Sequence, residues 1–253
     1  MSNDYPNIII TRDAPLIISE PSANMHYGTI YMGPGAYIEI RAGSNFIVEK
    51  LDVYDDLNVP DTRVSVAYTS LSYDERLIDW NYHIIVTGMP GKNGENGSNG
   101  SDWGECGEKG KPSRIPGSNA PGSFTITIKE LCFYATILST GGLGGNGGNG
   151  GKGAAGYDGT SQTDPGGIGG DGGDGGNGSN AGNAASALTV KYASTQDFFP
   201  TVDCVAASGG SGGIGGNHGR NGKYYSGSSQ PKNGSNGSAG LPGQKGTVTI
   251  QKI

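Results

Sequence analysis

The chain has 253 residues, a formal net charge of -6 and 33% hydrophobic residues, and glycine fills 49 positions. So few apolar residues restrict a conventional core to part of the chain. The negative charge and the lack of a basic patch argue against nucleic acid and anionic membranes as partners, and no stretch reaches the roughly 18–20 apolar residues that span a bilayer. The N-terminus, MSNDYPNIIITRD, lacks the basic and apolar regions of a classical signal peptide.

Residues 1–88 predict a small all-β domain, either a sandwich or a β-roll. Short β-prone runs alternate with turn residues, at a spacing that is typical of several short strands. Ile38 and Phe46 are expected in its core, and residues 73–80 could form one helical turn. The expected strands lie at residues 7–11, 15–19, 28–32, 36–40, 46–53, 63–68 and 82–86.

From residue 89 the composition changes to glycine triplets. Glycine occupies every third position of residues 141–159 and again of residues 166–178. A period of three fits neither an α-helix nor a strand, but it fits the left-handed extended helix with three residues per turn. Proline is too scarce for collagen, with 13 residues in the chain. We therefore expect packed polyglycine II helices, with a disordered glycine-rich linker as the alternative.

The number of glycines per triplet predicts where each helix lies in the bundle. Most triplets of residues 141–159, 166–178 and 209–222 hold two glycines, which leaves one edge with side chains. These three helices are expected in the middle. Residues 91–100 and 234–246 hold one glycine per triplet, so they are expected on the outside.

Short β-strands are expected beside the bundle, at residues 123–139, 187–193 and 247–253. The predicted fold class is mainly irregular and β. A small N-terminal all-β domain (1–88) is followed by a bundle of packed left-handed polyglycine II helices flanked by short β-strands (89–253).

The loops between the glycine runs concentrate aromatic residues on turns. A rigid scaffold that carries polar and aromatic loops is the usual arrangement for recognition, and tyrosine and tryptophan are favoured in binding loops. The alternative is that these aromatic side chains only cover the ends of the bundle. The candidate ligand-binding residues are Trp103, Tyr157, Phe198, Phe199, Tyr224 and Tyr225.

No pattern in the sequence predicts catalysis or metal binding. The three histidines, His26, His83 and His218, have no metal-ligand spacing, and the three cysteines are expected as free thiols. Asp171 and Asp174 would stack about 9 Å apart on a helix with three residues per turn, too far to share one Ca²⁺. We expect no enzyme, no cofactor and no metal.

Residues 88–246 resemble the glycine-motif domain of the tip adhesins on the long tail fibres of T-even phages. The runs GGLGGNGGNGG, GGIGGDGGDGG and GGSGGIGGNHG carry the resemblance. It implies a sandwich of polyglycine II helices whose intervening loops bind outer-membrane proteins or sugars of the host. Similar glycine-triplet tracts occur in poorly characterised bacterial proteins and in a springtail antifreeze protein.

The predicted function is that of a receptor-binding, adhesin-like module. Its partner would be a cell-surface protein or glycan, and the N-terminal domain would attach to a larger assembly or self-associate. The expected location is extracellular or on a virion, or alternatively the bacterial cytoplasm or an inclusion before release. The alternative function is that of a structural or secreted bacterial protein, toxin-like or self-assembling. Ice binding is disfavoured because the helix edges carry Asn, Asp, Lys and Arg.

Overall fold

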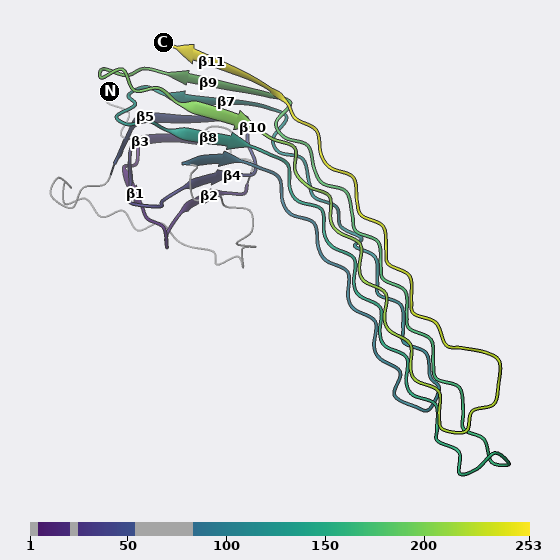
Figure 1. Ribbon diagram of the computed structural model, residues 1–253. Coiled ribbons are helices and arrows are strands. Elements are labelled where there is room, and N and C mark those ends of the chain that lie inside the picture. Colours follow the sequence, from purple (N-terminus) through teal and green to yellow (C-terminus); the bar gives the residue numbers. More distant parts are fainter. Residues whose placement is uncertain (1–4, 21–24, 54–82) are drawn as a thin grey trace.

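The computed structural model describes residues 5–20, 25–53 and 83–253. Its strands are β1 (Ile8–Ile10), β2 (Leu16–Ile18), β3 (Met25–Met32), β4 (Ile38–Ile40), β5 (Asn45–Val53), β6 (Ile84–Val86), β7 (Ser123–Ile128), β8 (Thr136–Ser139), β9 (Ala187–Tyr192), β10 (Thr201–Cys204) and β11 (Thr247–Lys252). One sheet has the order β1-β3-β5-β7-β9-β11 and the other β10-β8-β6-β4-β2, and all ladders are parallel (Figure 1). Successive strands alternate between the sheets, which makes a two-sheet parallel β-solenoid.

This architecture shows that the predicted fold class is wrong. The expectation was a small all-β domain followed by a helix bundle with flanking strands. The described residues form no α-helix, and the strands form two parallel sheets of six and five strands, each of which takes strands from both sides of residue 88. The physical reason is that the apolar strands after residue 120 complete the core begun by β1 to β6, and parallel strands allow the long excursions between them.

The core lies between the two sheets and is built from side chains stacked in register. Phe46 on β5 pairs with Ile126 on β7, which pairs with Val190 on β9, and all three side chains are buried. Burial of each such side chain stabilises the fold by about 1.5–3 kcal/mol. Ile38 is also fully buried, so the expectation for Ile38 and Phe46 is confirmed.

Several expected elements differ in detail. The apolar stretch 123–139 divides into β7 and β8, which lie in different sheets. Strand β10 was not expected, because its sequence TVDC shows little apolar character. The strand expected at 63–68 and the helical turn expected at 73–80 lie outside the described residues.

Three connections between the sheets leave the solenoid as long glycine-rich excursions (Figure 1). Each runs outward from β6, β8 or β10, turns, and returns to β7, β9 or β11. We call the six extended stretches the first to sixth glycine segments and their assembly the glycine slab. They comprise residues 88–102, 104–120, 140–159, 166–186, 205–222 and 231–246.

Backbone hydrogen bonds between the glycine segments repeat every three residues. Gly91, Gly94 and Gly97 of the first segment donate their N–H groups to carbonyls of the third, with N···O distances of 2.7–2.8 Å. This is the repeat of polyglycine II, in which backbone groups pair only with neighbouring chains. The third and fourth segments are each hydrogen-bonded to four neighbouring segments, whereas the fifth is bonded to three and lies nearer the slab edge, contrary to its expected central place.

The slab has two layers, one of the first, third and fifth segments and one of the second, fourth and sixth, and Asn and Asp side chains connect segments within each layer. Asn93 Oδ1 accepts the N–H of Asn146 at 2.8 Å, and Asn146 Oδ1 accepts the N–H of Ser211 at 3.0 Å. In the other layer, Asp171 and Asp174 accept N–H groups of the sixth segment at 2.7 and 2.9 Å. Each of these bridges needs only one side-chain oxygen as acceptor, which both Asn and Asp provide; the second oxygen of Asp174 pairs with Lys109. The acidic pair therefore has a structural role.

The two ends of the solenoid differ in how well their core is covered. At the first strand, Ile8 and Ile10 are each 3% exposed, whereas Ile250 on the last strand is 46% exposed. Thr247 and Ile253 donate their N–H groups toward β9, so the backbone groups of Ile250 point away from the sheet. Within residues 5–20, 25–53 and 83–253, the last strand therefore presents a free edge.

Candidate functional site

Three turns lie together at the far end of the glycine slab, and we call them the tip loops (Figure 1). They comprise residues 101–104, 157–166 and 222–231, that is, the turns together with the adjoining ends of the outward and returning segments. Gly104 donates its N–H to the carbonyl of Ala155 at 3.0 Å, and Gly159 donates its N–H to the carbonyl of Lys223 at 3.0 Å. Loops that are far apart in sequence are thus fixed against one another by the slab.

The tip loops carry four of the six candidate residues. Trp103, Tyr157 and Tyr224 are 70%, 48% and 53% exposed. The Tyr157 ring also lies against Gly167, and the half-buried Tyr225 lies across Gly227, so Tyr225 packs within its own loop. Trp103, Tyr157 and Tyr224 are therefore the side chains available to a partner at this end.

Phe198 and Phe199 lie at the opposite end of the molecule, in the connection between β9 and β10 (Figure 1). Phe198 is half-buried against the solenoid core, whereas Phe199 is exposed. Both rings contact Tyr134 edge to face, with centroid distances of 5.1 Å. The structure thus divides the predicted residues into two groups, and it adds Tyr134, which the sequence reasoning missed because Tyr134 lies within residues 123–139, which were expected to be a strand.

Both aromatic regions contain a strained backbone position. Asp197 and Tyr224 have φ values of 57° and 58°, and they are the non-glycine residues with positive φ among those that the structure describes. This conformation costs roughly 1–2 kcal/mol for a residue with a side chain, and such strain is concentrated at functional sites. Asp197 precedes the two phenylalanines directly.

Asp158 ties the second tip loop to the fifth segment by an ion pair and to the third tip loop by a hydrogen bond. Arg220 Nη1 lies 2.9 Å from Asp158 Oδ1, and the backbone N–H of Lys223 donates to the same oxygen at 3.0 Å. The hydrogen bond from Arg220, followed by that from Lys223, lowers the pKa of Asp158 from 3.8 to about 2. Because both groups are exposed, this pair orders the loops more than it stabilises the fold.

The carboxyl group of Asp158 is expected to titrate near pH 2 in the folded protein. Its folded pKa lies below the unfolded value, so its contribution to stability is present above about pH 4 and is lost as the pH falls toward 2. NMR of side-chain carboxyl carbons can follow the midpoint, with Asp158→Asn to assign the signal. Arg220→Gln should move the midpoint upward, and an unchanged midpoint would contradict the pairing.

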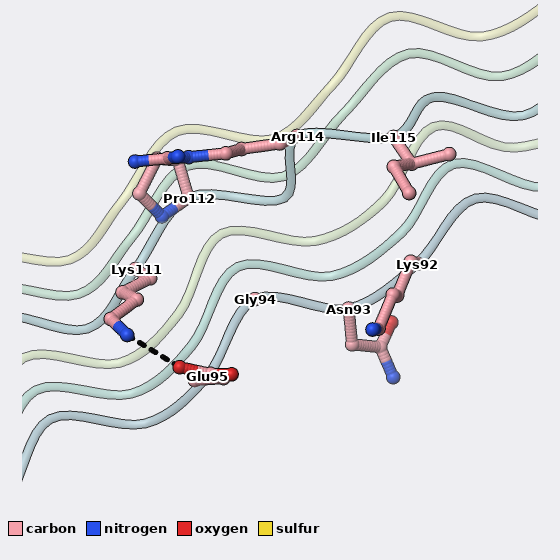
Figure 2. A pocket seen from close by; sticks show the side chains of 8 residues that line it. All are labelled: Lys92, Asn93, Gly94, Glu95, Lys111, Pro112, Arg114 and Ile115. Carbon is pink, nitrogen blue, oxygen red and sulfur yellow. Dashed lines mark hydrogen bonds and ion pairs between the residues drawn. The ribbon is translucent and has the colours of Figure 1, made fainter.

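A groove with a volume of about 330 Å³ lies along the outer edge of the slab, between the first and second glycine segments. Figure 2 shows that Lys111 on the second segment reaches toward Glu95 on the first, and Lys92 and Asn93 line the same groove from the first segment. Lys111 Nζ forms an ion pair with Glu95 Oε2 at 2.5 Å. The lining residues are Lys92, Asn93, Gly94, Glu95, Lys111, Pro112, Arg114 and Ile115.

The groove arises from one extra residue in the second segment. Gly107, Gly110, Ser113, Gly117 and Ala120 donate to fourth-segment carbonyls that are three residues apart throughout, at 171, 174, 177, 180 and 183. The second segment uses four residues for one of these steps, from 113 to 117. In Figure 2 the chain makes a sharp step at Arg114. This bulge places the Arg114 side chain above the groove.

Ser179 on the fourth segment compensates for the bulge. Gly142 and Gly148 of the third segment donate their N–H groups to carbonyls of the second segment at 2.9 Å. The bulge removes the corresponding carbonyl from Gly145, and Ser179 Oγ accepts the Gly145 N–H instead at 2.8 Å. The hydroxyl also donates to the carbonyl of Ile115 at 3.2 Å. The extra residue in the second segment and the serine in the fourth segment are thus structurally coupled.

The groove is cationic although the whole chain is negatively charged. Lys92 and Arg114 are exposed, and no carboxylate of the described residues lies within ion-pair distance of either. Lys111 lowers the pKa of Glu95 through their hydrogen bond. Two cations are therefore available to an anion at this place.

Groups that could support catalysis are few in the described part of the chain. No cluster of three or more His, Cys, Asp or Glu side chains there could hold a metal ion. Burial raises the pKa of the Cys132 thiol to about 11 and lowers the pKa of His83. Cys132 is therefore protonated and a poor nucleophile at neutral pH. Among the described residues, no helix has the length and apolarity needed to cross a bilayer.

The sequence contained a signal for the groove. Glycines of the second run follow at residues 104, 107 and 110, and the next one stands at 117, seven residues later. Two regular triplets would end at 116. The extra residue was hidden because the stretch Lys111–Pro116 also has the composition of an ordinary turn.

The comparisons with known proteins assign no family. No family model matches the chain, and no curated protein matches it. Among solved structures, an antifreeze protein from the springtail Granisotoma rainieri, described as a bundle of nine polyproline type II helices, is 26% identical over 62% of this chain and 95% of its own, with a TM-score of 0.10. At that score the two folds do not superpose, so the match indicates neither a function nor a relation to tail-fibre adhesins.

Proposed function

We propose that this chain is a non-enzymatic receptor-binding module in which the glycine slab presents the tip loops to a protein or glycan at a cell surface. The observation that carries the proposal is the gathering of three sequence-distant loops, with Trp103, Tyr157 and Tyr224 exposed, at one end of a rigid scaffold. Exposed tryptophan and tyrosine side chains are typical anchors of binding surfaces. Such a module would act outside the cell or on a virion.

The strained conformation of Tyr224 supports the same proposal. A φ of 58° is retained only where the surroundings impose it. A glycine could adopt the same turn without strain, but it would not place a large aromatic ring there. The Asp158–Arg220 pair adds order to the loops beside it. A preorganised loop loses less entropy when it binds. The free edge at β11 would remain for attachment to a larger assembly.

Alanine substitution of the exposed tip aromatics tests the proposal. The protein is labelled with a fluorophore, and its binding to outer-membrane vesicles of Gram-negative bacteria is measured. We expect Trp103→Ala and Tyr224→Ala each to weaken binding about tenfold, since a truncated anchor costs more than ~1 kcal/mol. Both side chains are exposed, so the free energy of unfolding should change little.

Phe199→Ala is the matched control, because it removes an exposed aromatic side chain at the opposite end of the molecule. It should leave vesicle binding unchanged. If both tip variants bind as the wild type does, or if Phe199→Ala alone abolishes binding, the tip loops are not the recognition surface.

A further inference from the structure

The bulge at Arg114 is the one break in the triplet repeat of the described glycine segments. The chain accommodates it with Ser179, which takes the place of a glycine. A regular second segment with glycine at 179 would satisfy the same backbone groups, so the bulge is not needed for folding. Departures from a local rule that are compensated elsewhere mark functional positions, and bulges redirect side chains next to such sites.

From this we infer that the groove beside the bulge binds the carboxylate of an acidic sugar, with Arg114 and Lys92 as the anion-binding side chains. This is a site separate from the tip loops, and it does not depend on the function proposed for them. The planar guanidinium of Arg114 can bind both oxygens of a carboxylate. Lys92 lines the same groove from the first segment, where it would contribute a second positive charge.

The other lining residues fit a sugar better than an acidic peptide. Asn93 Oδ1 is engaged by the Asn146 N–H, which leaves its amide N–H groups as donors, and Glu95 can accept hydrogen bonds from hydroxyl groups. A second acidic side chain of a peptide would meet Glu95 unfavourably. Pro112 and Ile115 offer apolar surface to the C–H face of a ring.

The size and the surroundings of the groove limit the ligand further. A volume of about 330 Å³ lies at the lower end of the about 300–1,000 Å³ of ligand pockets, which suits one or two sugar rings. The net charge of -6 disfavours a long, dense polyanion such as a nucleic acid. A uronic acid unit within an oligosaccharide combines one carboxylate, several hydroxyls and an apolar face.

Calorimetry with oligogalacturonate, a carboxylate-bearing probe, tests the inference, with heparin oligosaccharides as the sulfate-bearing probe and dextran oligosaccharides as the neutral one. The wild type should bind oligogalacturonate most tightly and lose affinity as salt is added. Arg114→Gln should weaken binding about tenfold or more. Lys109→Gln is the matched control, because Lys109 is an exposed cation of the same segment that pairs with Asp174 outside the groove.

A second variant removes the groove and keeps the fold. Deletion of Arg114 together with Ser179→Gly restores the triplet repeat and should abolish sugar binding, whereas Trp103→Ala should leave it intact. The inference is overturned if Arg114→Gln binds oligogalacturonate as the wild type does, if the combined variant still binds, or if dextran or heparin is preferred. Vesicle binding through the tip loops is measured separately, so either site can fail without the other.

Discussion

Replacing Gly150 by alanine is expected to destabilise the glycine slab by at least ~3–5 kcal/mol, or to prevent it from forming. A Cβ atom at Gly150 in the third segment would lie 1.9 Å from the carbonyl oxygen of Gly173 in the fourth. The obstacle is backbone on both sides, so no side chain can turn away to relieve it. An effect of this size belongs to the small class of severe single substitutions.

Urea unfolding measures this effect, with Gly122→Ala as the matched control. A Cβ atom at Gly122 would have the Ser186 Oγ as its nearest neighbour, at 3.9 Å, which is an ordinary contact. Gly122→Ala should therefore change the free energy of unfolding by less than about 1 kcal/mol. Equal stability of the Gly150→Ala and Gly122→Ala proteins would show that the segments are not packed backbone against backbone.

Deleting Arg114 is expected to destabilise the protein by ~3 kcal/mol or more, and Ser179→Gly is expected to rescue the deletion. Without the extra residue, the second segment would run past Ser179 as it now runs past Gly176 and Gly182. A Cβ atom at Gly176 or Gly182 would lie 2.2 or 1.8 Å from a backbone carbonyl oxygen of the second segment. The Ser179 side chain would then meet the same obstacle.

Ser179→Gly alone is expected to cost about 1–3 kcal/mol, because it leaves the buried Gly145 N–H without its acceptor. The combined variant regains a carbonyl for that N–H and loses the clash, so its stability should lie within about 1 kcal/mol of the wild type. A double-mutant cycle by urea unfolding gives the coupling. Simple additivity of the two losses would refute the compensation.

Deletion of Lys109 provides the control for this cycle. It also shortens the second segment by one residue. The deletion lies between Gly107 and Gly110, where the triplet repeat is regular, so it puts the hydrogen bonds of these two residues out of register with the fourth segment. Ser179→Gly should not rescue that deletion. Rescue of that deletion would mean that glycine at 179 offsets the loss of stability from any shortening of the second segment, and that its effect is not specific to the bulge.

How far the sequence predicts the fold depends on how local the interaction is. The triplet repeat of residues 141–159 was readable because each triplet carries its own glycine. The pairing of the strands was not readable: Phe46 pairs with Ile126, and two glycine segments lie between them in sequence. Parallel pairing across such distances leaves no short-range pattern. The separate N-terminal all-β domain was inferred from short turns, which also suit antiparallel strands.

The candidate site also has a part that the sequence predicted and a part that required the tertiary structure. Aromatic residues on turns, such as Trp103 and Tyr224, were found from composition. Their separation from Phe199 by the length of the molecule depends on which end of the solenoid each connection leaves (Figure 1). Tyr134 joins Phe199 only because β8 and β10 are neighbours in the same sheet. The groove at Arg114 required the hydrogen-bond register of two further segments.

The sequence by itself determined that main chains approach one another closely, because glycine at every third residue leaves no side chain to separate them. That the recurring Asn and Asp side chains bridge the segments was shown only by the structure, since the sequence favoured a solvated edge for Asp171 and Asp174. The tertiary structure alone decided that the strands before and after residue 88 share one core, and that a single extra residue opens a groove. Both depend on partners more than 60 residues away, such as Ser179 beside Ser113, and no local pattern records such a partner.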